Sequence, residues 1–181
     1  MIAAISLELT DLGWAKIHIR IGGKIYSGPG ISYCTDAFGD LARLALCAAT
    51  GASRSEASFE LEPGELRIVL TRQSANDSAC LLSVVEFPDY LHPPSPESEG
   101  RLCFGTEIDD RDFAQGMLAA LDLVWNTYGQ DQFNARWQGR RGFPVAATEA
   151  LRRALEVTDP KPYDEAFEEM WAELIDEAAE D

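Results

Sequence analysis

The sequence predicts an α+β protein in which an antiparallel, meander-rich sheet of about six to seven strands is covered on one face by helices, followed by a helical C-terminal third. Three observations lead to this class. Residues 14–21 alternate strictly between apolar and polar side chains, which is typical of a half-buried strand. Residues 36–50 are apolar around most of a helix. From Asp109 onward, apolar residues recur at helical spacing.

The first strands lie at residues 2–9, 14–21 and 24–26. Along residues 14–21 the apolar side chains are Ala15, Ile17, Ile19 and Ile21, and the polar ones are Lys16, His18 and Arg20. Turn residues at 11–13 and 22–23 connect the three segments as hairpins. This first block is therefore expected to be a meander with one face in solvent.

A helix is predicted between Thr35 or Asp36, which are good N-cap residues, and Gly51, which suits the position after a helix. Its only polar stripe consists of Asp36, Asp40 and Arg43. A helix so nearly apolar is expected to be the central one, packed on the sheet.

A second block of strands is predicted at residues 55–61, 66–71, 80–87 and 101–108. Pro63 and Gly64 at the centre of residues 62–65 indicate a type II turn, which would place Glu60 opposite Arg67 on the solvent face. Residues 91–100 carry three prolines and are expected to form an exposed loop. The sequence leaves open whether the two blocks join in one sheet.

The helical third begins at Asp109 or Asp110, and Gly129 is expected to end its first helix. A short helix follows at residues 130–138, and another runs from residues 143–144 to about residue 156. Residues 1–159 are expected to form a single α+β domain. Residues 160–181 are expected to form an acidic amphipathic helix that docks by its apolar stripe on this domain or on a second subunit.

The net charge of −16 is the main outlier in composition. It argues against nucleic acid and anionic membranes as partners, because neutralising phosphates requires clustered Lys and Arg. Residues 161–181 contribute nine acidic side chains against Lys161 alone. The charge serves solubility or attracts a basic protein partner. The N-terminal residues lack the basic region of a signal peptide, so we expect a cytoplasmic location.

No catalytic, cofactor-binding or metal-binding residues are expected. His18 lies on a solvent face and His92 in the proline-rich loop, so neither indicates a general base. The four cysteines, at positions 34, 47, 80 and 103, are expected to be reduced and buried, because no Cys-x-x-Cys pair occurs. Pairs of carboxylates are frequent in so acidic a chain and do not define an acid–base pair.

Two stretches carry a resemblance to a known type of protein. They are Tyr33-Cys34-Thr35-Asp36-Ala37-Phe38-Gly39-Asp40-Leu41 and Phe59-Glu60-Leu61-Glu62-Pro63-Gly64-Glu65-Leu66-Arg67. The chain resembles acidic bacterial proteins of the immunity-protein type found with polymorphic toxin systems, over about residues 30–140. The shared motifs are a helix start and a turn, so the resemblance assigns no functional residue. It implies a protein that binds a toxin domain.

The leading hypothesis is therefore an acidic inhibitor, an immunity protein that neutralises a basic toxin domain such as a nuclease, and not an enzyme. The alternatives are a small enzyme that uses carboxylates and a homodimeric structural or adaptor protein. The acidic side chains expected to contact a basic partner lie in the second strand block and its connections: Glu60, Glu62, Glu65, Glu97, Glu99, Glu107 and Asp109.

Overall fold

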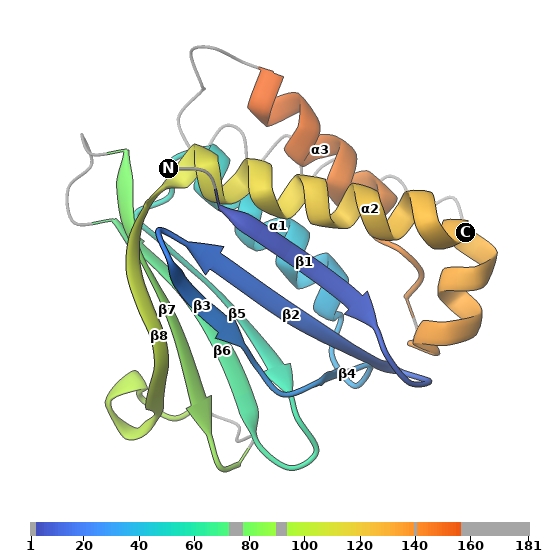
Figure 1. Cartoon of the computed structure of the whole chain (residues 1–181), viewed down its shortest axis with the longest axis horizontal. Coiled ribbons are helices and arrows are strands. Elements are labelled where there is room, and N and C mark those ends of the chain that lie inside the picture. The colour runs from blue at the N-terminus through green and yellow to red at the C-terminus, as the bar shows by residue number, and fades with distance from the viewer. Residues whose placement is uncertain (1–2, 73–77, 90–93, 140, 157–181) are drawn as a thin grey trace.

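The structure is a computed structural model of the chain, and it describes residues 3–72, 78–89, 94–139 and 141–156. The α+β class is confirmed, with strands in two antiparallel sheets and helices packed against them (Figure 1). The acidic helix predicted for residues 160–181 lies outside the described residues, as does His92.

The first sheet contains β1 (Ala4–Leu9), β2 (Trp14–Ile21), β3 (Lys24–Ser27) and β4 (Ile31–Ser32). β2 pairs with each of the other three strands, all antiparallel. The predicted alternation is confirmed, since Ala15, Ile17, Ile19 and Ile21 are all buried. The opposite face carries Lys16, His18 and Arg20, as expected.

The second sheet contains β5 (Arg54–Glu60), β6 (Glu65–Arg72), β7 (Ala79–Phe87) and β8 (Arg101–Asp109), paired in sequence order. The sequence left open whether the two blocks join in one sheet, and the structure shows that they form separate antiparallel sheets of four strands each. β3 and β8 lie side by side without strand pairing, and side-chain contacts join them. The Lys24 ammonium donates to the Gly105 carbonyl at 2.9 Å, and the Tyr26 and Phe104 ring centroids are 6.2 Å apart.

The helices are α1 (Ala37–Ala49), α2 (Asp110–Trp137) and α3 (Val145–Glu156). The predicted break at Gly129 is confirmed, because this residue has non-helical backbone angles (φ 59°, ψ 179°) within α2. All residues of α1 except Asp40, Arg43 and Cys47 are buried, so the predicted central helix is also confirmed. Gly51 follows α1 with φ +83°, a conformation that glycine adopts readily.

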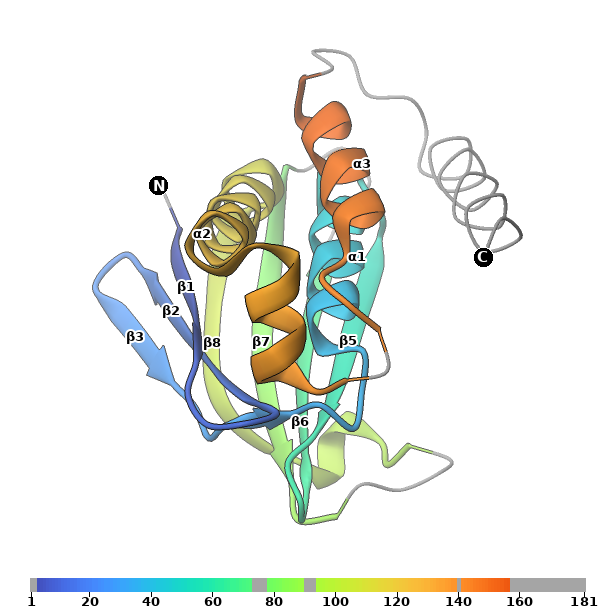
Figure 2. The same ribbon diagram turned by 90° about the vertical axis from the view of Figure 1, so that its right-hand side faces the viewer.

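The core lies between the helices and the inner faces of the two sheets (Figure 2). α1 packs against β5, α2 packs against β1, and the three helices contact one another. Four phenylalanine side chains at the centre are at most 1% exposed: Phe38, Phe59, Phe113 and Phe133. Two connecting segments lie next to each other at the rim of this core. One leads from β4 into α1, and the other follows α2.

Part of the outer face of the second sheet is covered as well. Residues 94–100, which include a short 3₁₀ helix (η1, Glu97–Glu99), lie over it. Arg67 donates to the Ser95 carbonyl at 2.9 Å, and Gly100 packs against Val85 and Phe87. Val69, Val85 and Phe87 are buried beneath or beside this segment, outside the main core.

The predicted turn at residues 62–65 is wrong in its register. Glu60 pairs with Glu65 across the hairpin, so Arg67 lies opposite Ser58 and not opposite Glu60. β5 ends at Glu60, and the Leu61 amide donates to the Gly64 carbonyl at 2.9 Å within a four-residue loop. The Glu62–Pro63 peptide bond in this loop is cis.

Candidate functional site

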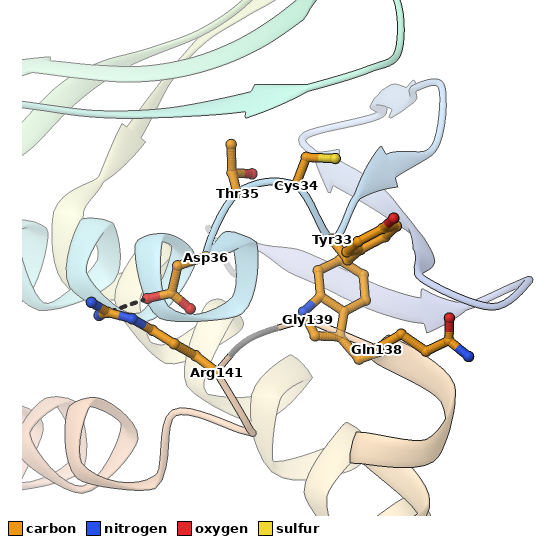
Figure 3. A pocket seen from close by; sticks show the side chains of 8 residues that line it. Tyr33, Cys34, Thr35, Asp36, Gln138, Gly139 and Arg141 are labelled. Atoms are coloured by element: carbon orange, nitrogen blue, oxygen red, sulfur yellow. Dashed lines mark ion pairs between the residues drawn. The ribbon is translucent and has the colours of Figure 1, made fainter.

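A cavity of about 490 Å³ lies at the rim of the core, between residues 33–36 and the segment that follows α2 (Figure 3). Residues 33–36 connect β4 to α1, and the other wall is formed by residues 137–139 together with Arg141. Ligand cavities in proteins typically measure about 300–1,000 Å³. Its size and its mixture of aromatic and charged walls make this cavity the candidate site.

The turn between β1 and β2 holds the two walls together. The Gly13 amide donates to the Arg136 carbonyl at 2.7 Å, and the Tyr33 amide donates to the Gly13 carbonyl at 2.9 Å. Gly13 has φ +75°, and a Cβ atom at this position would clash with the Tyr33 ring. A glycine is therefore needed here, because it allows both the backbone conformation and the close approach of the ring.

The aromatic wall of the cavity combines a fixed side chain with an accessible one. Trp137 is 3% exposed and contacts Phe38 edge to face, with ring centroids 4.9 Å apart. Phe133 and Phe143 extend this aromatic cluster toward the core. Tyr33, in contrast, is 43% exposed. The cavity thus has a rigid indole wall and a tyrosine ring that a partner can reach.

The charged wall is built around Asp36 at the start of α1. Its Oδ2 atom lies 2.7 Å from Arg43 Nη2 and 3.6 Å from Arg141 Nη1 (Figure 3). Asp40, one turn further on, contacts the same Arg43 nitrogen at 2.6 Å. Burial raises the pKa of Asp40, although its hydrogen bond with Arg43 acts in the opposite direction. The predicted polar stripe of α1 is thus an ion-pair cluster at the cavity.

Cys34 on the cavity wall contacts an acidic turn of the second sheet. Its thiol donates to Glu62 Oε1 at 2.8 Å. This hydrogen bond is the main reason that the pKa of Cys34 lies above the ordinary thiol value, and the charge of Glu60 adds to the effect. A raised pKa favours the protonated thiol, so the arrangement does not activate Cys34 as a nucleophile.

The structure divides the seven acidic residues predicted to contact a partner. Glu62 contacts the cavity-wall residue Cys34, and Glu60 is close enough for its charge to act on the same thiol, so these two carboxylates form an acidic rim next to the lining residues. Glu65 is 1% exposed and pairs with buried Arg67 (Nη2–Oε1, 2.7 Å), so the expectation that it contacts a partner is wrong. Asp109 caps α2 by accepting from the Arg111 and Asp112 amides at 3.0 and 3.2 Å.

The other predicted contact residues lie on the second sheet. Glu97 forms an ion pair with Arg54, whereas Glu99 and Glu107 are exposed to solvent. The seven residues therefore do not form one surface. The sequence interpretation also missed Tyr33, Trp137 and Arg141 as site residues, although Phe133 and Trp137 lie four residues apart on one face of α2.

The prediction that the cysteines are reduced agrees with the structure, since no disulfide joins the four cysteines. The prediction that they are buried holds for Cys80 alone, because Cys34 is exposed and Cys47 and Cys103 are half-buried. Within the described ranges, no cluster of three His, Cys, Asp or Glu side chains is placed to hold a metal ion. Nor does any helix there have the length and apolar character needed to cross a membrane.

We found no family model that matches the chain, and no curated protein or solved structure that is similar to it. The functional argument therefore depends on the cavity, its walls and the charge of the chain.

Proposed function

We propose that the chain is a protein-binding inhibitor, an immunity protein that neutralises a basic toxin domain in the cytoplasm, and that it acts by binding and not by catalysis. The observation that carries this proposal is the position of the cavity. Cys34 on its wall donates to Glu62, and its walls carry Tyr33 and Trp137. An acidic rim with aromatic anchors suits a basic polypeptide, since aromatic side chains dominate binding energy and complementary charge speeds association.

The overall charge supports the same partner chemistry. A net charge of −16 repels nucleic acid and accelerates the approach of a basic protein. Most arginines near the cavity are already paired internally, as Arg43 is with Asp36 and Asp40. The rim carboxylates Glu60 and Glu62, in contrast, have no ion pair with any Lys or Arg among the described residues. They remain available to cations from outside.

The two alternatives have weaker support. An enzyme that uses carboxylates needs a carboxyl group of raised pKa facing a cavity. Burial raises the pKa of Asp40 and Asp110, but Arg43 and Arg72 hold these side chains in ion pairs, and neither lines the cavity. A homodimeric adaptor would need an extended apolar face. Exposed apolar side chains such as Leu12, Ile25 and Leu123 come from different elements.

The experiment is to measure binding of the full chain to the purified toxin domain encoded beside its gene, by stopped-flow association at two salt concentrations. The double variant Glu60→Gln/Glu62→Gln should associate more slowly and depend less on salt. The matched control is Glu99→Gln/Glu107→Gln, which removes the same charge from exposed positions away from the cavity. Equal effects of the two double variants would contradict the cavity as the contact site, and the lack of a toxin gene beside this one would contradict the immunity role.

A further inference from the structure

Asp36 forms a short ion pair with one arginine and a longer, more exposed ion pair with another, and this difference indicates what the cavity binds. Arg43 comes from the next turns of α1, lies 2.7 Å from Asp36 and is 27% exposed. Arg141 comes from the segment after α2, lies 3.6 Å from the same oxygen and is 75% exposed. Arg43 is thus a fixed partner of Asp36. Arg141 reaches the same carboxylate from solvent, on the side of Asp36 that faces away from Tyr33 (Figure 3).

We propose that this cavity is a binding site for a guanidinium group, the side chain of an arginine on the partner, and that Arg141 competes for the Asp36 carboxylate in the free protein. The proposal rests on the proposed function, because it names the side chain by which a basic partner would be anchored. In the complex, the arginine of the partner donates to Asp36 from the cavity side, and Arg141 gives up its ion pair and moves into solvent.

The walls match the chemistry of a guanidinium better than that of an ammonium. A guanidinium is planar, weakly hydrated and able to stack on aromatic rings while it donates to a carboxylate. Trp137 and Tyr33 supply rings on one side of the cavity, and Asp36 supplies the carboxylate on the other. A lysine ammonium is strongly hydrated and donates from a point charge, so it gains less from this arrangement.

Exchange of the two arginines is energetically feasible. An exposed ion pair such as that of Arg141 contributes only about 0–1 kcal/mol, so it is displaced at little cost. The acidic rim then favours the incoming cation, since Glu60 and Glu62 lie beside Cys34 on the cavity wall. The fixed Arg43 keeps Asp36 in place during the exchange, because its contact at 2.7 Å comes from the same helix.

The test uses small probes and the assigned indole N–H signal of Trp137 in the full chain. N-acetyl-arginine amide should shift this signal in a saturable way. N-acetyl-lysine amide and N-acetyl-citrulline amide should shift it much less, since the first lacks the planar group and the second lacks the charge. Arg141→Gln should bind the arginine probe about two- to fivefold more tightly, because the internal competitor is removed. Arg20→Gln, which makes the same charge change on the outer face of the first sheet, should not.

Asp36→Asn should abolish the shift, and its far-ultraviolet spectrum shows whether it has folded. If Asp36→Asn has not folded, the comparison of Arg141→Gln with Arg20→Gln tests the proposal instead. Weaker or unchanged binding in Arg141→Gln, or equal shifts with the three probes, overturns the proposal.

The two proposals fail separately. A toxin domain that binds through Glu60 and Glu62 while the arginine probe leaves Trp137 unchanged supports the proposed function and overturns the guanidinium site. A probe that binds with the expected preference, in a chain whose partner binding does not depend on the rim, supports the guanidinium site and overturns the proposed contact surface.

Discussion

Both sheets have four antiparallel strands, but they differ in how much of their outer faces is exposed to solvent. In the first sheet one face packs into the core, while the other exposes side chains such as Ser6, Glu8 and Lys16. In the second sheet every residue of β6 from Glu65 to Leu70 is buried. Residues 94–100 cover its outer face around Arg67, and the ion pair of Glu65 with Arg67 lies beneath them. Leu81, Leu102 and Glu107, on the outer face of β7 and β8, are exposed.

This difference shows when alternation along a strand is informative. Alternation reports burial reliably where one face meets water, because polar side chains are then confined to that face. A charged residue on a doubly covered strand looks the same in the sequence as one in solvent. For this reason the sequence predicts Arg67 on a solvent face. In the structure Glu65, Ser95 and Phe87 surround it, and the Phe87 ring centroid lies 4.5 Å from its guanidinium carbon.

The largest expected effect compares the same new charge on the two outer faces. Val69→Asp places an unpaired carboxylate at a position that is 1% exposed, which should lower the free energy of unfolding by about 3 kcal/mol or more. Ser6→Asp, on the exposed face of the first sheet, should change it by less than about 0.5 kcal/mol. Urea unfolding measures both. A mild effect of Val69→Asp would show that the outer face of the second sheet is open in solution.

The next effect concerns the buried ion pair. Glu65→Ala leaves Arg67 buried without its partner and should cost about 3–5 kcal/mol. Glu8→Ala on the first sheet removes an exposed carboxylate opposite Lys16 and should cost less than about 1 kcal/mol. The double variant Glu65→Leu/Arg67→Met should recover most of the stability, because it removes both charges. If both alanine variants unfold at the same urea concentration, the burial assigned to Glu65 is wrong.

A smaller effect distinguishes two glycines at the edges of the two sheets. A Cβ atom at Gly100 would clash with Val85 and Phe87, so Gly100→Ala should cost about 1–3 kcal/mol by overpacking. Gly23 has open space around it but φ +86°, so Gly23→Ala should cost about 1 kcal/mol through backbone strain alone.

A double-mutant cycle separates the two causes. Val85→Ala should reduce the cost of Gly100→Ala, because it removes the side chain that the new Cβ meets, and it should add independently to Gly23→Ala. Independence in both pairs would show that residues 94–100 do not rest on Val85.

Much of the fold could be predicted from the sequence because its signals are local. The predicted bounds of β2, the break at Gly129 and the buried face of α1 all match the structure. β4 was missed, since two residues carry no periodicity. The separation into two sheets could not be predicted either. β3 and β8 meet through side-chain contacts and not through strand pairing, and the pattern along each strand carries no signal for this difference.

The candidate site was only partly predictable. Its acidic neighbours, Glu60 and Glu62, follow from charge and turn position. Its aromatic and basic members, Tyr33, Trp137 and Arg141, come together through a tertiary contact in which Gly13 bonds to both walls. Trp137 lies four residues after Phe133 in the same helix, a spacing that is typical of ordinary core residues. Nothing local indicates that its ring also forms the wall of a cavity.

The smallest expected effect on stability concerns the contact between Cys34, which follows the first sheet, and Glu62, which lies in a turn of the second. The thiol donates to the carboxylate, and this raises the pKa of Cys34 above the ordinary thiol value. A raised pKa favours the protonated form, so any stabilisation from this group is present below the ordinary thiol pKa and is lost as pH rises through the raised value.

Alkylation by iodoacetamide follows the thiolate, so at pH 8 Cys34 should react more slowly than an ordinary exposed cysteine. Glu62→Gln removes the negative charge that opposes ionisation, and Cys34 should then react faster, while the free energy of unfolding changes by less than about 0.5 kcal/mol. Mass spectrometry of labelled peptides gives the rate at each cysteine. Cys80, whose pKa burial raises to about 11, should stay unlabelled in both proteins, and Cys103 should react at the same rate in both. An unchanged rate at Cys34 would mean that Glu62 does not contact the thiol in solution, and the link between the two sheets at the cavity rim would then be absent.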